Sequence, residues 1–240
     1  MNATAAAAAR TASEVFYEHG LFCKGGLLSH VGLSAVGNSF LATWAAFTVT
    51  AVVAVFATSG PLFYHYYWPS KVTYEKWSRK SNPEFPSPEK VRDEIVQMLK
   101  GVVCAALCPA ASVCLAVAGG GWTKAYCGAA TPWGGGGEGG DWAGVGFHAW
   151  TFAWVLLASD FWEFYYHYLG HQHKILWNNH KHHHKFFNPS PFAVIADEFV
   201  DQFFRATPLV IFPMLAPVNI EWVPSSLPFR WLHSNARFSM

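Results

Sequence analysis

The chain has 240 residues, of which 52% are hydrophobic and only 13% are charged, whereas about a quarter of the residues in soluble domains are charged. Its formal net charge is +1 and no block of basic residues occurs, which excludes the usual electrostatic signature of a nucleic-acid-binding protein. The chain also contains twelve tryptophans, and Trp and Tyr are enriched where membrane helices meet water. The composition therefore favours an integral membrane protein.

The first part of the chain predicts a tail followed by two membrane spans. Residues 1–38 are expected to form an N-terminal tail. Its first 24 residues resemble neither a strong signal peptide nor an obvious transit peptide, although their Ala, Arg and Thr without early acids leave a transit peptide as the alternative. The uncharged run Ser39–Ser59 is long enough to cross the ~30 Å hydrocarbon core, and the Gly-Pro pair after it is expected to end the helix. A charged connector over 71–100 leads to a second uncharged run, Gly101–Thr123, which Pro109 is expected to kink.

Residues 39–144 therefore hold two spans, the connector and a glycine-rich stretch, TPWGGGGEGGDW. That stretch is expected to be a flexible linker, because no Lys-Ser or Lys-Thr follows its glycines as a phosphate-binding loop requires. A third apolar run begins near Trp142 and continues to about His167. Residues 61–100 contain seven Lys or Arg, whereas the glycine-rich loop has only Lys124. The positive-inside rule then places the connector, and the chain after a third span, on the cytoplasmic side.

Seven of the twelve histidines lie within eighteen residues. Five of them form an H-x-x-x-H pair and an H-x-x-H-H set, and residues three or four apart share a helical face. His173 and His182 fall off those faces. Imidazole suits zinc, copper, iron and nickel, although a His-rich tract can also bind metal incidentally. The predicted metal ligands are His167, His171, His180, His183 and His184.

This segment resembles the fatty acid hydroxylase and sterol desaturase superfamily of membrane enzymes. The two histidine sets match the family's first and second boxes, and Asp160 and the later N-P-S-P-F-A run also fit its pattern. The resemblance implies an all-α, multi-span membrane protein with three or four transmembrane helices. Residues 145–220 would form the fatty acid hydroxylase-like domain, with its histidine boxes facing the cytoplasm from the endoplasmic reticulum.

The resemblance also implies a reaction. An iron-dependent oxidoreductase would use O₂ to hydroxylate or desaturate a C–H bond of a lipid, either a sterol or a fatty acyl chain. The five histidines would hold two non-haem iron ions, because ordinary side chains cannot perform such an oxidation. Electrons would come from an NAD(P)H reductase through a cytochrome b-type carrier. No catalytic residue is assigned; Glu163 is expected to orient His167, with solvated acids at the membrane boundary as the alternative.

The end of the chain departs from the family pattern. Family members carry a third H-x-x-H-H box, but the only histidine after the second box is His233. Residues 221–240 are therefore expected to be an atypical tail that results from truncation. The segment AVIADEFVDQFFR, with Asp197, Glu198 and Asp201, is predicted to be an interfacial helix, and the apolar run over 206–220 is short for a straight span.

Several alternatives stay open at this point. A non-catalytic, truncated relative would bind lipid or metal without turnover. The membrane acyl-chain desaturases usually have four residues inside their first box, unlike this chain. A haem protein needs histidines facing each other from two spans, and a metal transporter needs ligands near the bilayer centre.

Overall fold

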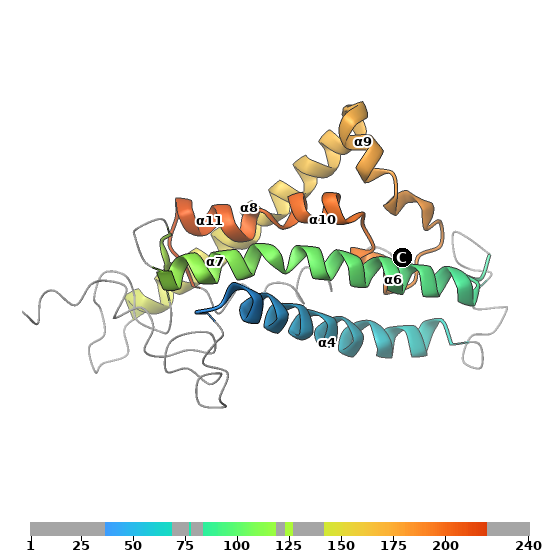
Figure 1. The fold of residues 1–240 in the computed structure, drawn as a ribbon, viewed down its shortest axis with the longest axis horizontal. Helices are drawn as coiled ribbons and strands as arrows, with labels where there is room; N and C mark the ends of the chain where they lie inside the picture. The colour runs from blue at the N-terminus through green and yellow to red at the C-terminus, as the bar shows by residue number, and fades with distance from the viewer. Residues whose placement is uncertain (1–36, 69–76, 78–83, 119–122, 127–141, 220–240) are drawn as a thin grey trace, which may run out of the picture. The chain divides into compact units, whose positions relative to one another are not determined.

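The computed structural model describes residues 37–68, 77, 84–118, 123–126 and 142–219. These residues are almost entirely helical (Figure 1). The only strands among them are β1 (Ala125–Tyr126) and β2 (Val218–Asn219), which pair in parallel. The all-α prediction is therefore confirmed apart from this short pairing. The helices are α4 (Phe40–Tyr66), α6 (Pro88–Ala105), α7 (Leu107–Ala118), α8 (Trp142–Gln172), α9 (Lys174–His180), α10 (Phe199–Ala206) and α11 (Pro208–Leu215), with 3₁₀ turns η1 (His183–Lys185) and η2 (Ala193–Ile195).

Several expectations fall outside the described residues. These are the N-terminal tail up to residue 36, the first part of the connector (residues 69–76 and 78–83), the glycine-rich stretch over 127–141 and the tail from 220 onward.

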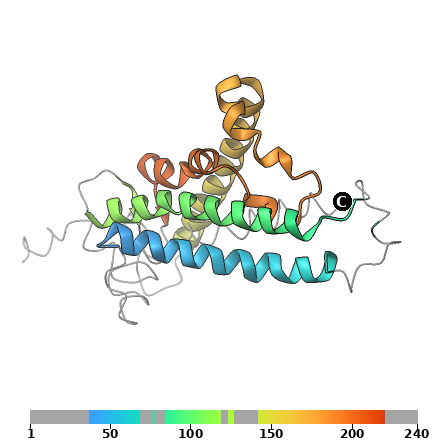
Figure 2. The same ribbon diagram turned by 45° about the vertical axis from the view of Figure 1, so that its right-hand side comes forward.

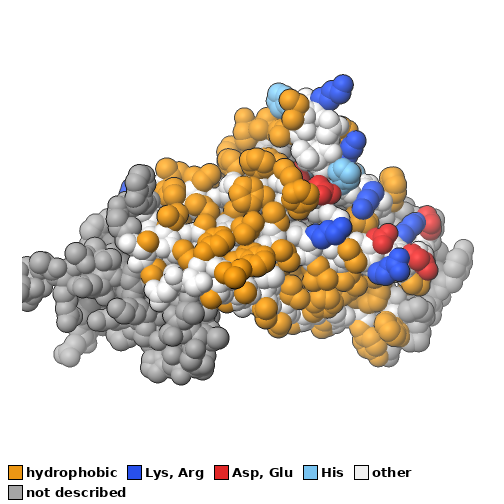
Figure 3. Space-filling view, in the orientation of Figure 1, with side chains coloured by type: hydrophobic (Ala, Val, Ile, Leu, Met, Phe, Trp, Pro, Cys, Tyr) orange, Lys and Arg blue, Asp and Glu red, His pale blue; other side chains and the backbone are white. Residues whose placement is uncertain are grey.

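Two helices are long and apolar enough to cross a membrane, namely α4 and the stretch Pro88–Ala118 that α6 and α7 share. Among the described residues α8 is not one of the two, so the third span stays a prediction, as does the cytoplasmic orientation. Apolar side chains on α4 are exposed, including Leu41 and Val49 at 66% and 62%. Hydrophobic side chains cover much of the visible surface in Figure 3, whereas charged ones gather over the start of α6.

Pro109 of the second predicted span and Pro61, which follows the first, have different local effects. Pro109 lies in the first turn of α7, and its missing N–H accounts for the interruption at Ala106 between α6 and α7. The expectation that Pro61 ends the first span is wrong, because α4 continues through it to Tyr66. The turns after Pro61 are held by packing instead: the ring of Phe63 lies 5.5 Å from that of Phe192.

The chain forms two compact units. The first comprises Met1–Phe47, Cys108–Phe161 and Thr207–Pro224. Within it, the backbone N–H of Lys124 donates to the carbonyl of Pro213 at 2.6 Å, next to the β1–β2 pairing.

The second unit comprises Thr48–Leu107, Trp162–Ala206 and Ser225–Met240, and it contains both histidine sets. Helix α6 is its central element. It begins at a Ser87 cap followed by Pro88, a favoured start for a helix. Its Met98 and Val102 form a buried core with Val55 of α4 and with Phe192 and Ala196, which follow the second histidine set. Helix α10 lies beside α6, and η2 also contacts it (Figures 1 and 2).

Candidate metal centre

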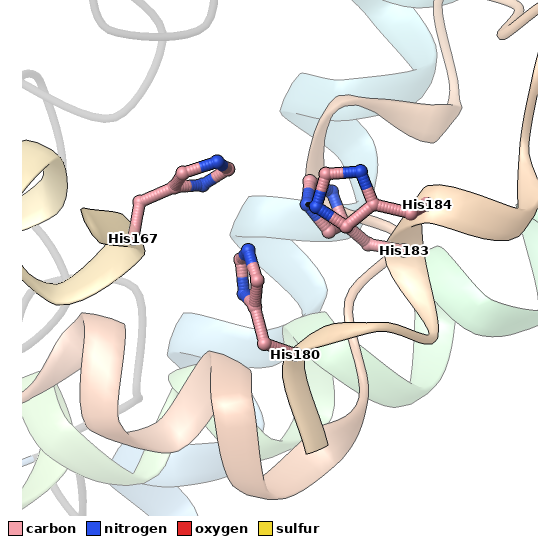
Figure 4. A group of neighbouring side chains, drawn as sticks. All are labelled: His167, His180, His183 and His184. Atoms are coloured by element: carbon pink, nitrogen blue, oxygen red, sulfur yellow. Dashed lines mark hydrogen bonds between the residues drawn. The ribbon is translucent and has the colours of Figure 1, made fainter. Parts of the chain in front are cut away.

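Two helices and a 3₁₀ turn of the second unit bring the predicted ligands together. His167 and His171 are one turn apart on α8, His180 ends α9, and His183 and His184 begin η1. In Figure 4 the imidazoles of His167, His180, His183 and His184 point toward a shared space. The two histidines that fell off the shared faces are exposed and precede α9 and η1. The structure therefore brings all five predicted residues together, while their role as ligands stays a prediction.

The Nε2 atoms of four imidazoles are closely spaced. His183 Nε2 lies 3.0 Å from His184 Nε2, which lies 3.2 Å from His171 Nε2, and the latter lies 3.2 Å from His167 Nε2. One ligand nitrogen from each of His167, His180, His183 and His184 lies within 4.8 Å of the others. Neighbouring nitrogens bound to one ion at about 2.0–2.1 Å are roughly 2.8–3.4 Å apart, from right-angled to tetrahedral coordination. The spacing therefore suits metal coordination.

His180 gives the strongest indication of a metal site. It is 1% exposed, and its Nδ1 lies 3.2 Å from Oδ2 of the equally buried Asp201. Because an ionised carboxylate can only accept, the proton belongs on Nδ1 and the lone pair on Nε2. That Nε2 is buried and has no hydrogen-bond partner among the described residues. An imidazole backed by a carboxylate, with its other nitrogen bare, is typical of a metal ligand.

Asp197 has the corresponding position behind His183. Its Oδ1 lies 3.5 Å from His183 Nδ1, and its other oxygen pairs with the guanidinium of Arg205. Arg205 also pairs with Glu163 of α8. Glu163 was expected to orient His167. In the structure Arg205 links it to Asp197, the carboxylate behind His183.

Three residues of the site were not assigned to it from the sequence. Asp197 and Asp201 were expected only as acids of one interfacial helix, but only Asp201 lies in a helix, because α10 begins at Phe199 and Asp197 precedes it. Gly170 lies in α8 just before His171, and a Cβ at this position would be 2.9 Å from Cγ of His180. A glycine inside a helix is unfavourable unless another group approaches it closely. The glycine next to His171 was therefore the one sequence feature that could have indicated this close contact.

Burial keeps two of the imidazoles neutral. Together with the charges of the neighbouring histidines, it lowers the pKa of His183 to about 3 and that of His167 to about 4. Both residues lie outside the two candidate membrane spans. Because metals bind the neutral imidazole, protons compete for these two nitrogens only in acid solution.

In the metal-free protein, His167 and His183 should therefore stay neutral down to about pH 5, well below the ordinary histidine pKa of ~6.5. Burial disfavours the charged form, so the shift is toward lower pH. Spectra of the ¹⁵N-histidine-labelled protein in detergent, recorded from neutral to acid pH, would follow each imidazole. A His183→Gln variant would identify the signals of that residue. Titration of both near the ordinary pKa would contradict the buried cluster.

Comparison with known proteins adds one finding. No curated protein and no solved structure matches the chain. The model of the family described as Fatty acid hydroxylase matches residues 152–238, a segment that includes every histidine of the cluster, and this match confirms the resemblance to the fatty acid hydroxylase and sterol desaturase superfamily.

Proposed function

We propose that this protein is a membrane oxidoreductase that uses O₂ and two non-haem iron ions to hydroxylate or desaturate a C–H bond of a sterol or fatty acyl lipid. The observation that carries the proposal is the buried His180, with Asp201 behind it and its bare Nε2 beside three other imidazoles. The choice of iron and of two ions follows the family match. Imidazole alone would also suit zinc or copper.

The residues of the chain have separate tasks in this proposal. The five clustered histidines would hold the metal, and iron would activate O₂ for the oxidation, which ordinary side chains cannot do. Asp201 keeps the proton of His180 on Nδ1 through a hydrogen bond, and Asp197, 3.5 Å from Nδ1 of His183, favours the same arrangement there, so that each Nε2 can bind metal. Arg205 offsets the charges of Asp197 and Glu163 at the edge of the cluster.

A lipid substrate is supported by the polarity of α10. Its Asp201 is buried against the histidines, whereas its aromatic side chains Phe199, Phe203 and Phe204 are 53%, 37% and 45% exposed. A helix with its acid inside and its aromatics outside suits contact with acyl chains better than contact with water. We propose that a lipid approaches the site from the bilayer of the endoplasmic reticulum, on its cytoplasmic side. Electrons would come from an NAD(P)H reductase through a cytochrome b-type carrier.

The ligand assignment is tested by two neighbouring substitutions. His183→Ala is expected to lower the iron bound per chain and to abolish lipid oxidation, because it removes a ligand. His182→Ala should change both much less, since His182 is exposed beside the cluster. Iron would be measured on the purified protein, and products as lipids that gain an oxygen or lose two hydrogens in expressing cells.

Two results would change the conclusion. Unchanged iron and product in His183→Ala would contradict the ligand assignment. Iron binding by the wild-type chain without any lipid product would favour the non-catalytic relative.

A further inference from the structure

We propose that Gln97 of α6 is a positioning residue for the histidine cluster, which holds the backbone of Asp197 and thereby fixes the imidazole of His183. The consequence for metal binding rests on the proposed function. The effect on His183 itself is a property of the metal-free protein.

One face of α6 carries polar side chains that the metal centre does not use. Glu94 and Gln97 are 1% and 7% exposed, and buried polar groups are costly unless they are hydrogen-bonded. Both find their partners in one segment, residues 190–197. The carboxylate of Glu94 accepts the backbone N–H of Ser190 at 3.1 Å, and Nε2 of Gln97 donates to the carbonyl of Asp197 at 2.7 Å.

Gly101 lets the same segment approach α6 closely. A Cβ at Gly101 would lie 2.8 Å from the carbonyl oxygen of Ile195 and 3.8 Å from that of Asp197. Gln97 and Gly101 lie three and seven positions after Glu94 in the helix, so the three residues share one face. Helix α6 therefore holds the segment at its start through Glu94 and at its end through Gln97 and Gly101.

Asp197 links this contact to the histidines. Its backbone is held by Gln97, while its carboxylate faces Nδ1 of His183 and pairs with Arg205. Without the amide donor, the buried carbonyl of Asp197 loses its hydrogen bond from Gln97, and the end of the segment can shift. The carboxylate would then move away from Nδ1, and His183 would no longer be held in one tautomer and orientation.

Ser59 of α4 provides a matched control. Its hydroxyl is buried and donates to the carbonyl of Pro191 at 3.0 Å, in the same segment but six residues before Asp197. Ser59→Ala therefore removes a comparable buried hydrogen bond without touching Asp197. Any general effect of loosening the segment should appear in this variant as well.

The experiment compares Gln97→Leu and Ser59→Ala in the full chain in detergent. In metal-free ¹⁵N-histidine-labelled protein, wild type and Ser59→Ala should show His183 as the Nδ1–H tautomer, and Gln97→Leu should show a mixture of tautomers. Titration with Co²⁺, followed by its visible absorption, should give about tenfold weaker binding and an altered spectrum only in Gln97→Leu.

The outcomes separate this inference from the proposed function. Unchanged His183 signals in Gln97→Leu, or the same change in Ser59→Ala, would overturn the positioning role. Altered signals in a protein that binds no Co²⁺ even as wild type would support that role and contradict the metal site. If leucine prevents folding, Gln97→Met keeps an unbranched side chain without the donor and provides the same test.

Discussion

Replacing Gly170 with alanine is expected to weaken metal binding by at least about tenfold and to destabilise the protein. The added Cβ would lie 2.9 Å from Cγ and 3.0 Å from Cδ2 of His180, distances at which the ring must move. The ring has little room to withdraw, because it is buried and its Nδ1 is held by Asp201. Overpacking of this kind typically costs about 1–3 kcal/mol, and here it also displaces a predicted ligand.

Gly146→Ala is the matched control on the same helix. Among the described residues, nothing beyond the local helix backbone lies within 4 Å of a Cβ at Gly146, and alanine is favoured over glycine in a helix by roughly 0.5–1 kcal/mol. This variant should therefore bind metal normally and be as stable as wild type or slightly more so. Co²⁺ titration and thermal unfolding in detergent would measure both variants. Equal behaviour of the two alanines would mean that His180 does not pack against Gly170.

The histidine spacing predicted which side chains gather, but only part of how they do so. His167 and His171 share a face of α8, as their four-residue spacing requires. The second set does not lie on one helix, because α9 ends at His180 and η1 begins at His183. Its imidazoles converge because the chain turns between these elements, and a turn of this kind is not encoded in the spacing.

The supporting residues could not be predicted because their partners are distant in the sequence. Glu94 and Gln97 belong to a stretch that was expected to be a charged connector, and their partners lie 96 and 100 residues away. Local patterns show that a side chain is polar, but not that another segment covers it. The start of α6 is easier to predict from the sequence, because Ser87 followed by Pro88 is a common helix beginning.

The second large effect is expected at Asp201. Asp201→Asn should weaken metal binding by roughly 10- to 100-fold, the usual result of changing a carboxylate behind a ligand histidine. The variant keeps the size of the side chain and removes its charge, so His180 becomes a poorer ligand. Glu198→Gln, three residues earlier and partly exposed, is the control and should bind metal as wild type does. Co²⁺ titration of the purified proteins compares the two.

Burial explains why asparagine cannot replace Asp201. The His180 side chain is 0% exposed and that of Asp201 1%, so water cannot replace the lost contact. An amide group at this position would also bring two N–H donors that need acceptors. Each buried group left unpaired costs about 1–3 kcal/mol, so the metal-free variant should also unfold at lower temperature. Wild-type affinity in Asp201→Asn would show that the carboxylate does not prepare His180 for metal.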